Sequence, residues 1–371
     1  MSRLLAAFAV DLYRSETLGL VEKAKGLVAA ARAAGHDVTA MFADGTRART
    51  FEGGIPGVPD NSDASTNGVG RRAAAFRFFG FWTAVESQLR EGNFDALWLR
   101  AHPVSTRQQR LLRSAEEAGV AVYYDIPTYP STGEAPSLSR RLLSSLTLPL
   151  TEIARHIYRF VTVSEHTLIE GRPTVRVRNG VALPSQPRLV QERDGPIRLL
   201  GLGQWSTYHG LDRLLHAIAG HPENYRVRIA GGGPAFEGYR KLAARLGVRA
   251  EWLPPAFGDH RDGLIAWADG GIGSLAIHRK GVYPDQALKH RVYAAHGLPF
   301  LCTTDDPHWA GVHGVWQVSA DESAIPSQVL AETLAGFRQN SRDLAMPLRN
   351  AAASTSWDRA YAPLFASFNE L

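Results

Sequence analysis

Short apolar runs alternate with amphipathic segments through the first half of the chain. Runs too short for a helix and bounded by turn residues favour buried strands, and longer segments with an apolar stripe favour helices. The predicted strands are residues 4–10, 37–42, 96–99, 120–124 and 161–164, and the predicted helices are residues 21–34, 76–91, 106–118 and 138–160, the last interrupted at Pro149. Residues 53–70, rich in Gly, Pro, Asn and Ser, are predicted to form a loop. This alternation predicts a parallel sheet with helices on both faces.

The alternation stops at residues 183–196, which carry three prolines and no apolar period and are interpreted as an interdomain linker. It then starts again. The further predicted strands are residues 198–203, 225–230, 250–253, 272–277, 299–302 and 315–318, and the helices are residues 211–219, 238–246, 262–268, 288–296 and most of the chain from 327. We therefore predict an α/β protein of two doubly wound, Rossmann-like domains facing each other across a cleft. The predicted boundaries are residues 1–185, residues 186–345, and a helical segment, residues 346–371, that packs back on the first domain.

Composition narrows the classes of function. The chain has 371 residues, 44% apolar and 21% charged, as in ordinary soluble globular proteins. Its net charge of +5 suits phosphate-bearing ligands or an anionic membrane surface. It is weak evidence for nucleic acid, which we do not expect as a partner. The single cysteine, Cys302, excludes an intrachain disulfide, and no Cys/His spacing typical of structural zinc occurs, so we expect a cytoplasmic protein.

Membrane insertion is not predicted. The apolar run Leu4–Val10 is interpreted as a buried strand and not as a signal peptide, because Asp11 and Arg14 follow at once. No apolar run approaches the roughly twenty residues needed to span a bilayer. Two basic amphipathic segments, residues 139–146 and 152–159, leave peripheral contact with the inner face of a membrane open, although a solvated helix face explains them slightly better.

Two glycine clusters follow predicted strands of the second half. Gly201-Leu-Gly203 precedes a predicted helix, and Gly231-Gly-Gly-Pro234 closes the next strand. Glycine lets the backbone approach a phosphate, and a helix N-terminus supplies free N–H groups. Each cluster alone is equally well explained as a tight turn. Together with a basic loop near the same sheet edge, they favour a phosphate site.

The basic loop lies in Gly271–Phe300, where four cations surround a loop and a helix start. Arg279 and Lys280 follow a predicted strand, at the sheet edge where ligands bind in this architecture. Lys289 opens the next helix, where a cation is unfavourable with the helix dipole. We interpret these side chains as phosphate ligands, against the alternative of ordinary surface charge.

Two first-half residues are candidates for the reaction centre. His102 follows a buried strand, and Asp125 ends the next one. An exposed histidine beside Pro103 and a structural aspartate are equally good explanations. Neither residue has a Ser or Cys nearby in a triad-like arrangement.

These residues, taken in order, resemble the GT-B glycosyltransferases, specifically the retaining family-4 (group 1) enzymes of bacterial polysaccharide assembly. Gly203–Leu215 resembles the first donor motif, in the variant that ends His-Gly-x-Asp-Arg, and Ala230–Pro234 resembles the second glycine turn. Gly273–Pro299 resembles the third motif, with Ser-Leu-x-x-His-Arg-Lys-Gly, then Leu-Lys, then Tyr. In the first half, residues 125–130, 163–164 and 179–181 also match, so the resemblance covers nearly the whole chain.

The resemblance implies a UDP- or GDP-linked sugar donor and a glycan, lipid-linked or small acceptor. It implies transfer with retention and without a metal or other cofactor, the first domain facing the acceptor and the second holding the donor. The implied donor-binding residues are Gly19, in a turn that closes over the phosphates, and Gly203, Gln204, His209, Gly232, Arg279, Lys280, Gln286 and Lys289. The implied catalytic residues are His102, Asp125 and Asp285.

The chain departs from the family pattern where donors are recognised. Gln204 stands where the family has a cation, and His209 is a known variant of the polysaccharide subgroup. The third motif has two glutamates eight positions apart, and here these positions are Pro284 and Val292. Asp285 is the acid that can replace the first glutamate, and nothing replaces the second. The alternative is therefore a non-catalytic homologue that binds a nucleotide or glycan as a partner subunit.

Overall fold

The computed structural model describes residues 1–11, 18–52, 55, 73, 75–100, 104–126, 129, 148–188, 194–281, 286–304 and 306–371. Within it the chain forms two compact units. The first unit is Met1–Gly180 together with Trp357–Leu371, and the second is Val181–Ser356. The chain thus returns to the first unit at Trp357, eleven residues after the start predicted for the C-terminal segment, because helix α12 (Ser341–Ala353) still belongs to the second unit.

The first unit is built on a sheet of order β3-β2-β1-β4-β5-β6-β8-β7. All neighbouring strands are parallel except the two outer pairs, β2 with β3 and β7 with β8. The strands are β1 (Arg3–Asp11), β2 (Asp37–Asp44), β3 (Arg47–Phe51), β4 (Ala96–Arg100), β5 (Ala121–Asp125), β6 (Arg159–Thr162), β7 (Leu168–Ile169) and β8 (Arg172–Arg176).

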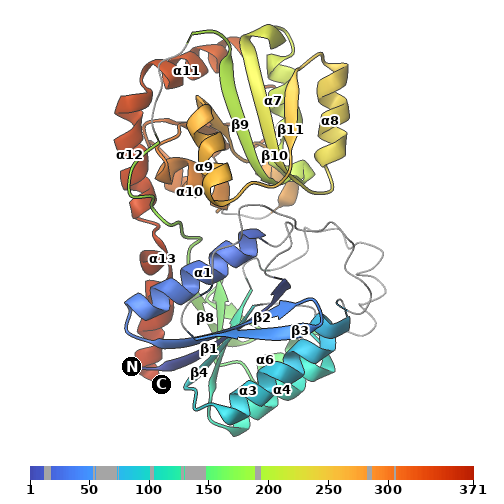
Figure 1. Ribbon diagram of the computed structural model, residues 1–371, viewed down its shortest axis with the longest axis vertical. Helices are drawn as coiled ribbons and strands as arrows, with labels where there is room; N and C mark the ends of the chain where they lie inside the picture. The colour runs from blue at the N-terminus through green and yellow to red at the C-terminus, as the bar shows by residue number, and fades with distance from the viewer. Residues whose placement is uncertain are drawn as a thin grey trace. The chain divides into compact units, whose positions relative to one another are not determined.

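Helices cover both faces of this sheet because successive strand residues point to opposite sides. Along β1, Leu4 and Ala6 join one buried cluster and Leu5 and Ala7 join the other. Helices α1 and α13 lie side by side on the first face, and α3 and α4 cover the second (Figure 1). The helices are α1 (Leu18–Ala33), the π-helix η1 (Phe76–Gly80), α3 (Phe81–Glu91), α4 (Thr106–Glu117), α6 (Thr151–Ala154), α13 (Trp357–Ala366) and the 3₁₀ helix η6 (Ser367–Glu370).

The second unit is built on an all-parallel sheet of order β11-β10-β9-β12-β13-β14. The strands are β9 (Ile197–Gln204), β10 (Tyr225–Gly232), β11 (Ala250–Leu253), β12 (Gly270–Ile272), β13 (Phe300–Thr303) and β14 (Val315–Val318). Leu199 faces the cluster formed with α7, α8 and α11, whereas Leu200 faces α9, α10 and α12. Each such fully buried leucine contributes about 1.5–3 kcal/mol to folding.

The helical elements of the second unit alternate with its strands. They are η2 (Thr207–His209), α7 (Leu211–Ile218), η3 (Pro222–Asn224), α8 (Phe236–Arg245), α9 (Gly258–Trp267), η4 (Ile277–Lys280), α10 (Leu288–Ala295), η5 (Pro307–Trp309), α11 (Ser327–Gln339) and α12. The predicted α/β class with two doubly wound parallel sheets is confirmed. No helix among the described residues is long and apolar enough to cross a membrane.

Two predicted elements are wrong, and three short strands were not predicted. The strand predicted at residues 272–277 ends at Ile272, because the buried residues that follow form a loop leading into η4. In the described part of the helix predicted at 138–160, only α6 is helical, and β6 begins at Arg159. The basic amphipathic helix predicted at 152–159 is therefore absent. Strands β3, β7 and β8, which the pattern did not predict, are short and lie at the ends of the sheet order.

Candidate functional site

The strand order of the second sheet marks one place where a ligand is expected. On one side of β9 the next strands are β10 and β11. On its other side they are β12, β13 and β14, so the strand order reverses between β9 and β12. Connections leave such a point toward opposite faces and open a crevice at the carboxyl ends of the two strands. Here β9 ends at Gln204 and β12 at Ile272. The segments that follow these two strands form the candidate site.

The two glycine clusters lie against each other beside this point. Gly203 (φ +137°) and Gly231 (φ +139°) are paired in the sheet and have backbone conformations that other residues rarely adopt. A Cβ on Gly231 would lie 1.8 Å from the carbonyl oxygen of Gly203. The next residue of each strand, Gln204 and Gly232, is also paired. The two glycine turns therefore lie next to each other at the same edge of the sheet, as predicted.

Two lysines and three aromatic rings gather at the candidate site. The Lys289 Nζ lies 4.4 Å from the ring centre of Trp205, and the Lys280 Nζ lies 5.2 Å from that of Tyr208. The His209 ring is 4.5 Å from Tyr208 and 5.6 Å from Trp205, centre to centre. We call these five residues the lysine–aromatic cluster. It brings together three of the predicted donor ligands: His209, Lys280 and Lys289.

His209 is held as a neutral imidazole. Burial and the positive charge of Lys289 lower its pKa well below the ordinary value. Its Nδ1 accepts the backbone N–H of Ser206 at 2.9 Å, which closes a capping box at η2. Because Nδ1 is the acceptor, the ring proton sits on Nε2. At neutral pH His209 is therefore a hydrogen-bond donor and not a cation.

A buried polar network supports the loop after β12. The His290 Nε2 accepts the backbone N–H of Ser274 at 3.0 Å, and its Nδ1 lies 3.2 Å from Asp306 Oδ2. The same carboxylate oxygen accepts from Arg291 and from the Trp309 indole. Burial alone would raise the pKa of Asp306, but the His290 hydrogen bond and the Arg291 charge outweigh it and lower the pKa. This network fixes the loop beside Lys289. Arg291, the fourth cation of Gly271–Phe300, is buried in it and bonded to Asp306, and its other members were not predicted as site residues.

Arg279 is a structural clamp and not a free phosphate ligand. Its Nη1 donates to the Thr207 carbonyl and Asp212, its Nη2 to Asp212 and Glu322, and its Nε to Glu322, at 2.7–3.0 Å. Every N–H of the guanidinium is thus engaged. The predicted diphosphate role of Arg279 is corrected for this reason. The clamp ties η4 to the turn that carries His209.

We expect Arg279→Lys to lower the free energy of unfolding by about 1–3 kcal/mol, because an ammonium cannot replace two bidentate contacts. The hydrogen bonds from Arg279, and next that from His278, lower the pKa of Glu322 to about 2. The clamp should therefore be intact above the ordinary glutamate pKa and weaken as the pH falls toward 2. Chemical denaturation at pH 7 and pH 3 measures both effects. As a control, Arg240→Lys changes an exposed pair on α8 and should change stability by less than about 0.5 kcal/mol.

In the first unit, Asp125 is buried in a charge cluster. Its Oδ2 lies 2.6 Å from Arg100 Nη1 and 3.7 Å from Lys23 Nζ, and its side chain is 1% exposed. Burial lowers the pKa of Lys23 to about 8, although Asp125 opposes the shift, and burial raises the pKa of the neighbouring Tyr361. The geometry corrects the prediction that Asp125 approaches a reaction centre. It neutralises cations at the ends of β4 and α1.

Replacing Lys23 with methionine is expected to raise the free energy of unfolding at pH 7 by about 1–3 kcal/mol, since a pKa shift from 10.5 to about 8 reflects a net cost of burying the charge. The unfolded chain holds this proton more tightly than the folded protein. Stability of the unaltered protein should therefore rise between pH 8 and 10.5, and that rise should be absent from the variant. Lys25→Met, on the more exposed side of α1, is the control and should be nearly neutral. A less stable Lys23→Met protein contradicts this account.

Other predicted site residues are placed as follows. Gly19 lies in the first turn of α1, so the predicted turn at this residue is wrong, and its contact with a donor phosphate stays a prediction. Gln286 precedes α10 and is half-buried. His102, Pro284 and Asp285 lie outside the described residues, as does the loop predicted at 53–70 except Ile55. Among the described residues, no three His, Cys, Asp or Glu side chains group so as to hold a metal ion.

No protein-family model matches the chain, and no curated protein matches it in sequence. Solved structures, however, match its whole length. AviGT4, a glycosyltransferase involved in avilamycin A biosynthesis, superposes with a TM-score of 0.60 at 16% identity, over 100% of this chain and 98% of its own. HepE of Anabaena, solved with UDP and glucose, has a TM-score of 0.58 at 13% identity, over 100% of both chains. An α-glucosyltransferase, solved with UDP-glucose and DNA containing an abasic site, has a TM-score of 0.60 at 11% identity, over 99% of this chain and 98% of its own.

The chain has the GT-B fold. Identities this low establish the fold alone and carry no residue role across. The GT-B assignment accounts for the two doubly wound sheets and for the return of the last helix to the first unit. It also places the lysine–aromatic cluster in the second GT-B unit, at the strand ends where doubly wound sheets bind their ligands.

Proposed function

We propose that this GT-B protein transfers a sugar from a UDP- or GDP-linked donor to a glycan, lipid-linked or small-molecule acceptor, with retention of configuration. The observation that carries the proposal is the lysine–aromatic cluster beside the glycine turns at Gly203 and Gly232. Two cations and a neutral imidazole N–H at a site of close backbone approach suit a diphosphate. The fold supports the proposal, since HepE is solved with UDP and glucose and the α-glucosyltransferase with UDP-glucose.

In the proposed reaction the bond between the sugar and the diphosphate oxygen breaks, and the electron pair leaves with that oxygen. The acceptor hydroxyl oxygen forms the new bond to the sugar carbon from the same face, and its proton passes to the departing diphosphate oxygen. Lys280 and Lys289 stabilise the negative charge that grows on the leaving diphosphate, and the His209 Nε2–H donates a hydrogen bond to it. Asp285 is proposed to contact the sugar. No metal is needed for this charge balance.

A non-catalytic homologue is the second candidate, and one observation favours it. Val292, at one of the two glutamate positions of the resembled motif, is partly buried against the apolar cluster of α9, α10 and α12. It offers no acid to a ribose or sugar. Such a protein would bind a nucleotide without turning over its sugar.

Release of nucleoside diphosphate from a panel of UDP- and GDP-hexoses tests the proposal, with thermal unfolding recorded for each compound. The proposal predicts that at least one donor raises the melting temperature and is hydrolysed or transferred faster than without protein. Stabilisation by nucleotides without turnover across a range of acceptors supports the non-catalytic candidate. If no nucleoside diphosphate or nucleotide sugar stabilises the protein, the transferase proposal is wrong, and so is a non-catalytic homologue that binds a nucleotide.

A further inference from the structure

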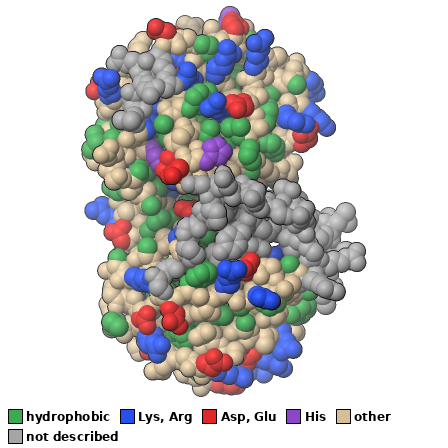
Figure 2. Space-filling view, viewed as in Figure 1, with side chains coloured by type: hydrophobic (Ala, Val, Ile, Leu, Met, Phe, Trp, Pro, Cys, Tyr) green, Lys and Arg blue, Asp and Glu red, His purple; other side chains and the backbone are tan. Residues whose placement is uncertain are grey.

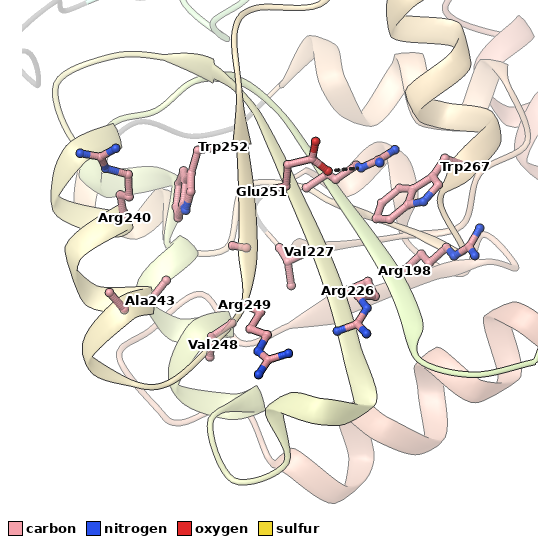
Figure 3. Close-up of a pocket in the computed structure, with 13 residues that line it drawn as sticks. Arg198, Arg226, Val227, Arg240, Ala243, Val248, Arg249, Glu251, Trp252 and Trp267 are labelled. Carbon is pink, nitrogen blue, oxygen red and sulfur yellow. Dashed lines mark hydrogen bonds and ion pairs between the residues drawn. The ribbon is translucent and has the colours of Figure 1, made fainter.

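A basic groove lies at the opposite end of the strands from the lysine–aromatic cluster. It has a volume of about 650 Å³ and lies along β9, β10, β11, α8 and the end of α9 (Figure 3). We call it the arginine groove, after the five arginines that line it: Arg198, Arg226, Arg228, Arg240 and Arg249. In the space-filling view, Lys and Arg side chains gather over this end of the second unit (Figure 2). Arg198 is the second residue of β9 and Gly203 the second last, so about 17 Å of strand separates the two sites.

Three of these arginines form a row across adjacent strands. Arg226 of β10 is paired with Arg198 of β9. Arg249 directly precedes Ala250, which is paired with Val227, so it stands next to Arg226 on the other side. Residues paired in this way on neighbouring strands point to the same face, and like charges side by side there are destabilising. The row is therefore an arrangement that an anion would stabilise.

The protein itself supplies little negative charge to the groove. Glu251 is its only acidic lining residue, and it is bonded to Arg228 at 2.6 Å. Arg226 and Arg249 are exposed, and neither forms an ion pair with any described residue. Elsewhere in the same unit, by contrast, Arg279 and Arg338 are bonded to carboxylates. Arg226 and Arg249 thus lack the carboxylate partners that Arg279 and Arg338 have in the same unit.

The aromatic side chains of the groove are occupied by the protein. The Trp267 ring lies 4.2 Å from the Arg228 guanidinium and 5.6 Å from that of Arg198. The Trp252 ring meets Phe236 edge to face at 5.1 Å. Nucleic-acid grooves of this kind hold bases on free aromatic faces, which these contacts reduce. The groove is instead lined by small apolar residues, among them Val248 and Ala250, which pack on the α8 side of the sheet, whereas Arg198 and Arg226 point to the α9 side.

We propose that the arginine groove binds a segment of an acidic glycan, whose carboxylates lie on the row of Arg198, Arg226 and Arg249. A planar guanidinium binds a carboxylate through two hydrogen bonds, and the small apolar lining residues suit the C–H faces of sugar rings. This site is separate from the proposed donor site and does not depend on transferase activity.

Binding of a defined oligogalacturonate, with a carboxylate on every sugar, tests the inference. The full-length protein should bind it with an affinity that falls as salt rises, and should not bind a neutral malto-oligosaccharide of the same length. The double variant Arg226→Ala/Arg249→Ala should lose at least tenfold in affinity. The control Arg107→Ala/Arg110→Ala removes the same charge from the exposed side of α4 in the other unit and should change affinity less than twofold. The melting temperature should not fall in either variant, since all four side chains are exposed, and it should rise slightly in Arg226→Ala/Arg249→Ala, which removes the repulsion between neighbouring charges.

Three results overturn the inference. The first is no binding of oligogalacturonate. The second is an equal loss in the two double variants, which indicates only the overall charge. The third is tighter binding of a single-stranded DNA oligomer of equal charge, lost with Arg226 and Arg249, which makes the groove a nucleic-acid site. Because these measurements use no nucleotide sugar, their failure leaves the proposed transferase function unaffected.

Discussion

Replacing both Lys280 and Lys289 with methionine is expected to weaken UDP or GDP binding by a factor of roughly 10²–10⁴, since each charge-assisted hydrogen bond contributes about 1.5–3 kcal/mol. Methionine keeps the length of the side chain, so the Trp205 ring that lies 4.4 Å from the Lys289 Nζ stays covered. Loss of affinity then reports the missing charge. Isothermal titration with the diphosphate that the unaltered protein binds measures the effect.

The matched control is Lys241→Met, an exposed lysine on α8 of the same unit. It removes one positive charge at a position outside the lysine–aromatic cluster and should change affinity less than twofold. Removing Lys289 also removes a positive charge that lowers the His209 pKa. The pKa of His209 should therefore rise in the variant, which NMR titration of the imidazole can follow. Unchanged diphosphate affinity in the double variant would exclude both lysines from the site.

Gly231→Ala is expected to lower the free energy of unfolding by at least about 4 kcal/mol, or to prevent folding. The new Cβ would lie 1.8 Å from the Gly203 carbonyl oxygen, and both atoms belong to backbone held in the sheet. Its φ of +139° adds strain that no side-chain movement can relieve. Equilibrium denaturation, or recovery of soluble protein if the variant does not fold, measures the effect.

Gly238→Ala is the control for this substitution. Gly238 lies in α8 with no atom within 4 Å of an added Cβ. Alanine there should stabilise the protein by up to about 1 kcal/mol, because it has the higher helix propensity. If both glycine variants behave alike, the close approach of β9 and β10 at the glycine turns is not as described.

Much of the fold could be predicted from the sequence because its long elements have strong periodic patterns. Each central strand has an apolar run, and Gly35, Gly119 and Gly297 follow helices in the left-handed conformation expected at helix ends. The errors occur where buried residues are not in regular structure. Ser274, Leu275 and Ala276 are as buried as a strand, yet they form a loop, in which the Leu275 N–H donates to the His209 carbonyl and not to a neighbouring strand. Sequence periodicity reports burial and not hydrogen-bond partners.

The candidate site could be predicted only in part, because the sequence does not show which distant residues pair with its side chains. Position after a strand indicated Lys280, position at a helix start indicated Lys289, and the family resemblance indicated His209. The structure brings these three residues into one cluster. The sequence did not show that Arg279 is saturated, since its partners Asp212 and Glu322 are far from it in sequence. Nor did it show that Asp125 is buried beside Lys23. Trp205 and Tyr208, the other members of the lysine–aromatic cluster, were not predicted. Their position shortly after the first glycine cluster was the signal in the sequence that could have indicated them.

A crystal structure of the protein with UDP or GDP tests the central claim most directly. The account predicts that the diphosphate lies at the carboxyl ends of β9 and β12, within hydrogen-bond distance of Lys280 or Lys289 and next to the Gly203 turn. A diphosphate bound in the arginine groove, or at any place remote from the lysine–aromatic cluster, would contradict it.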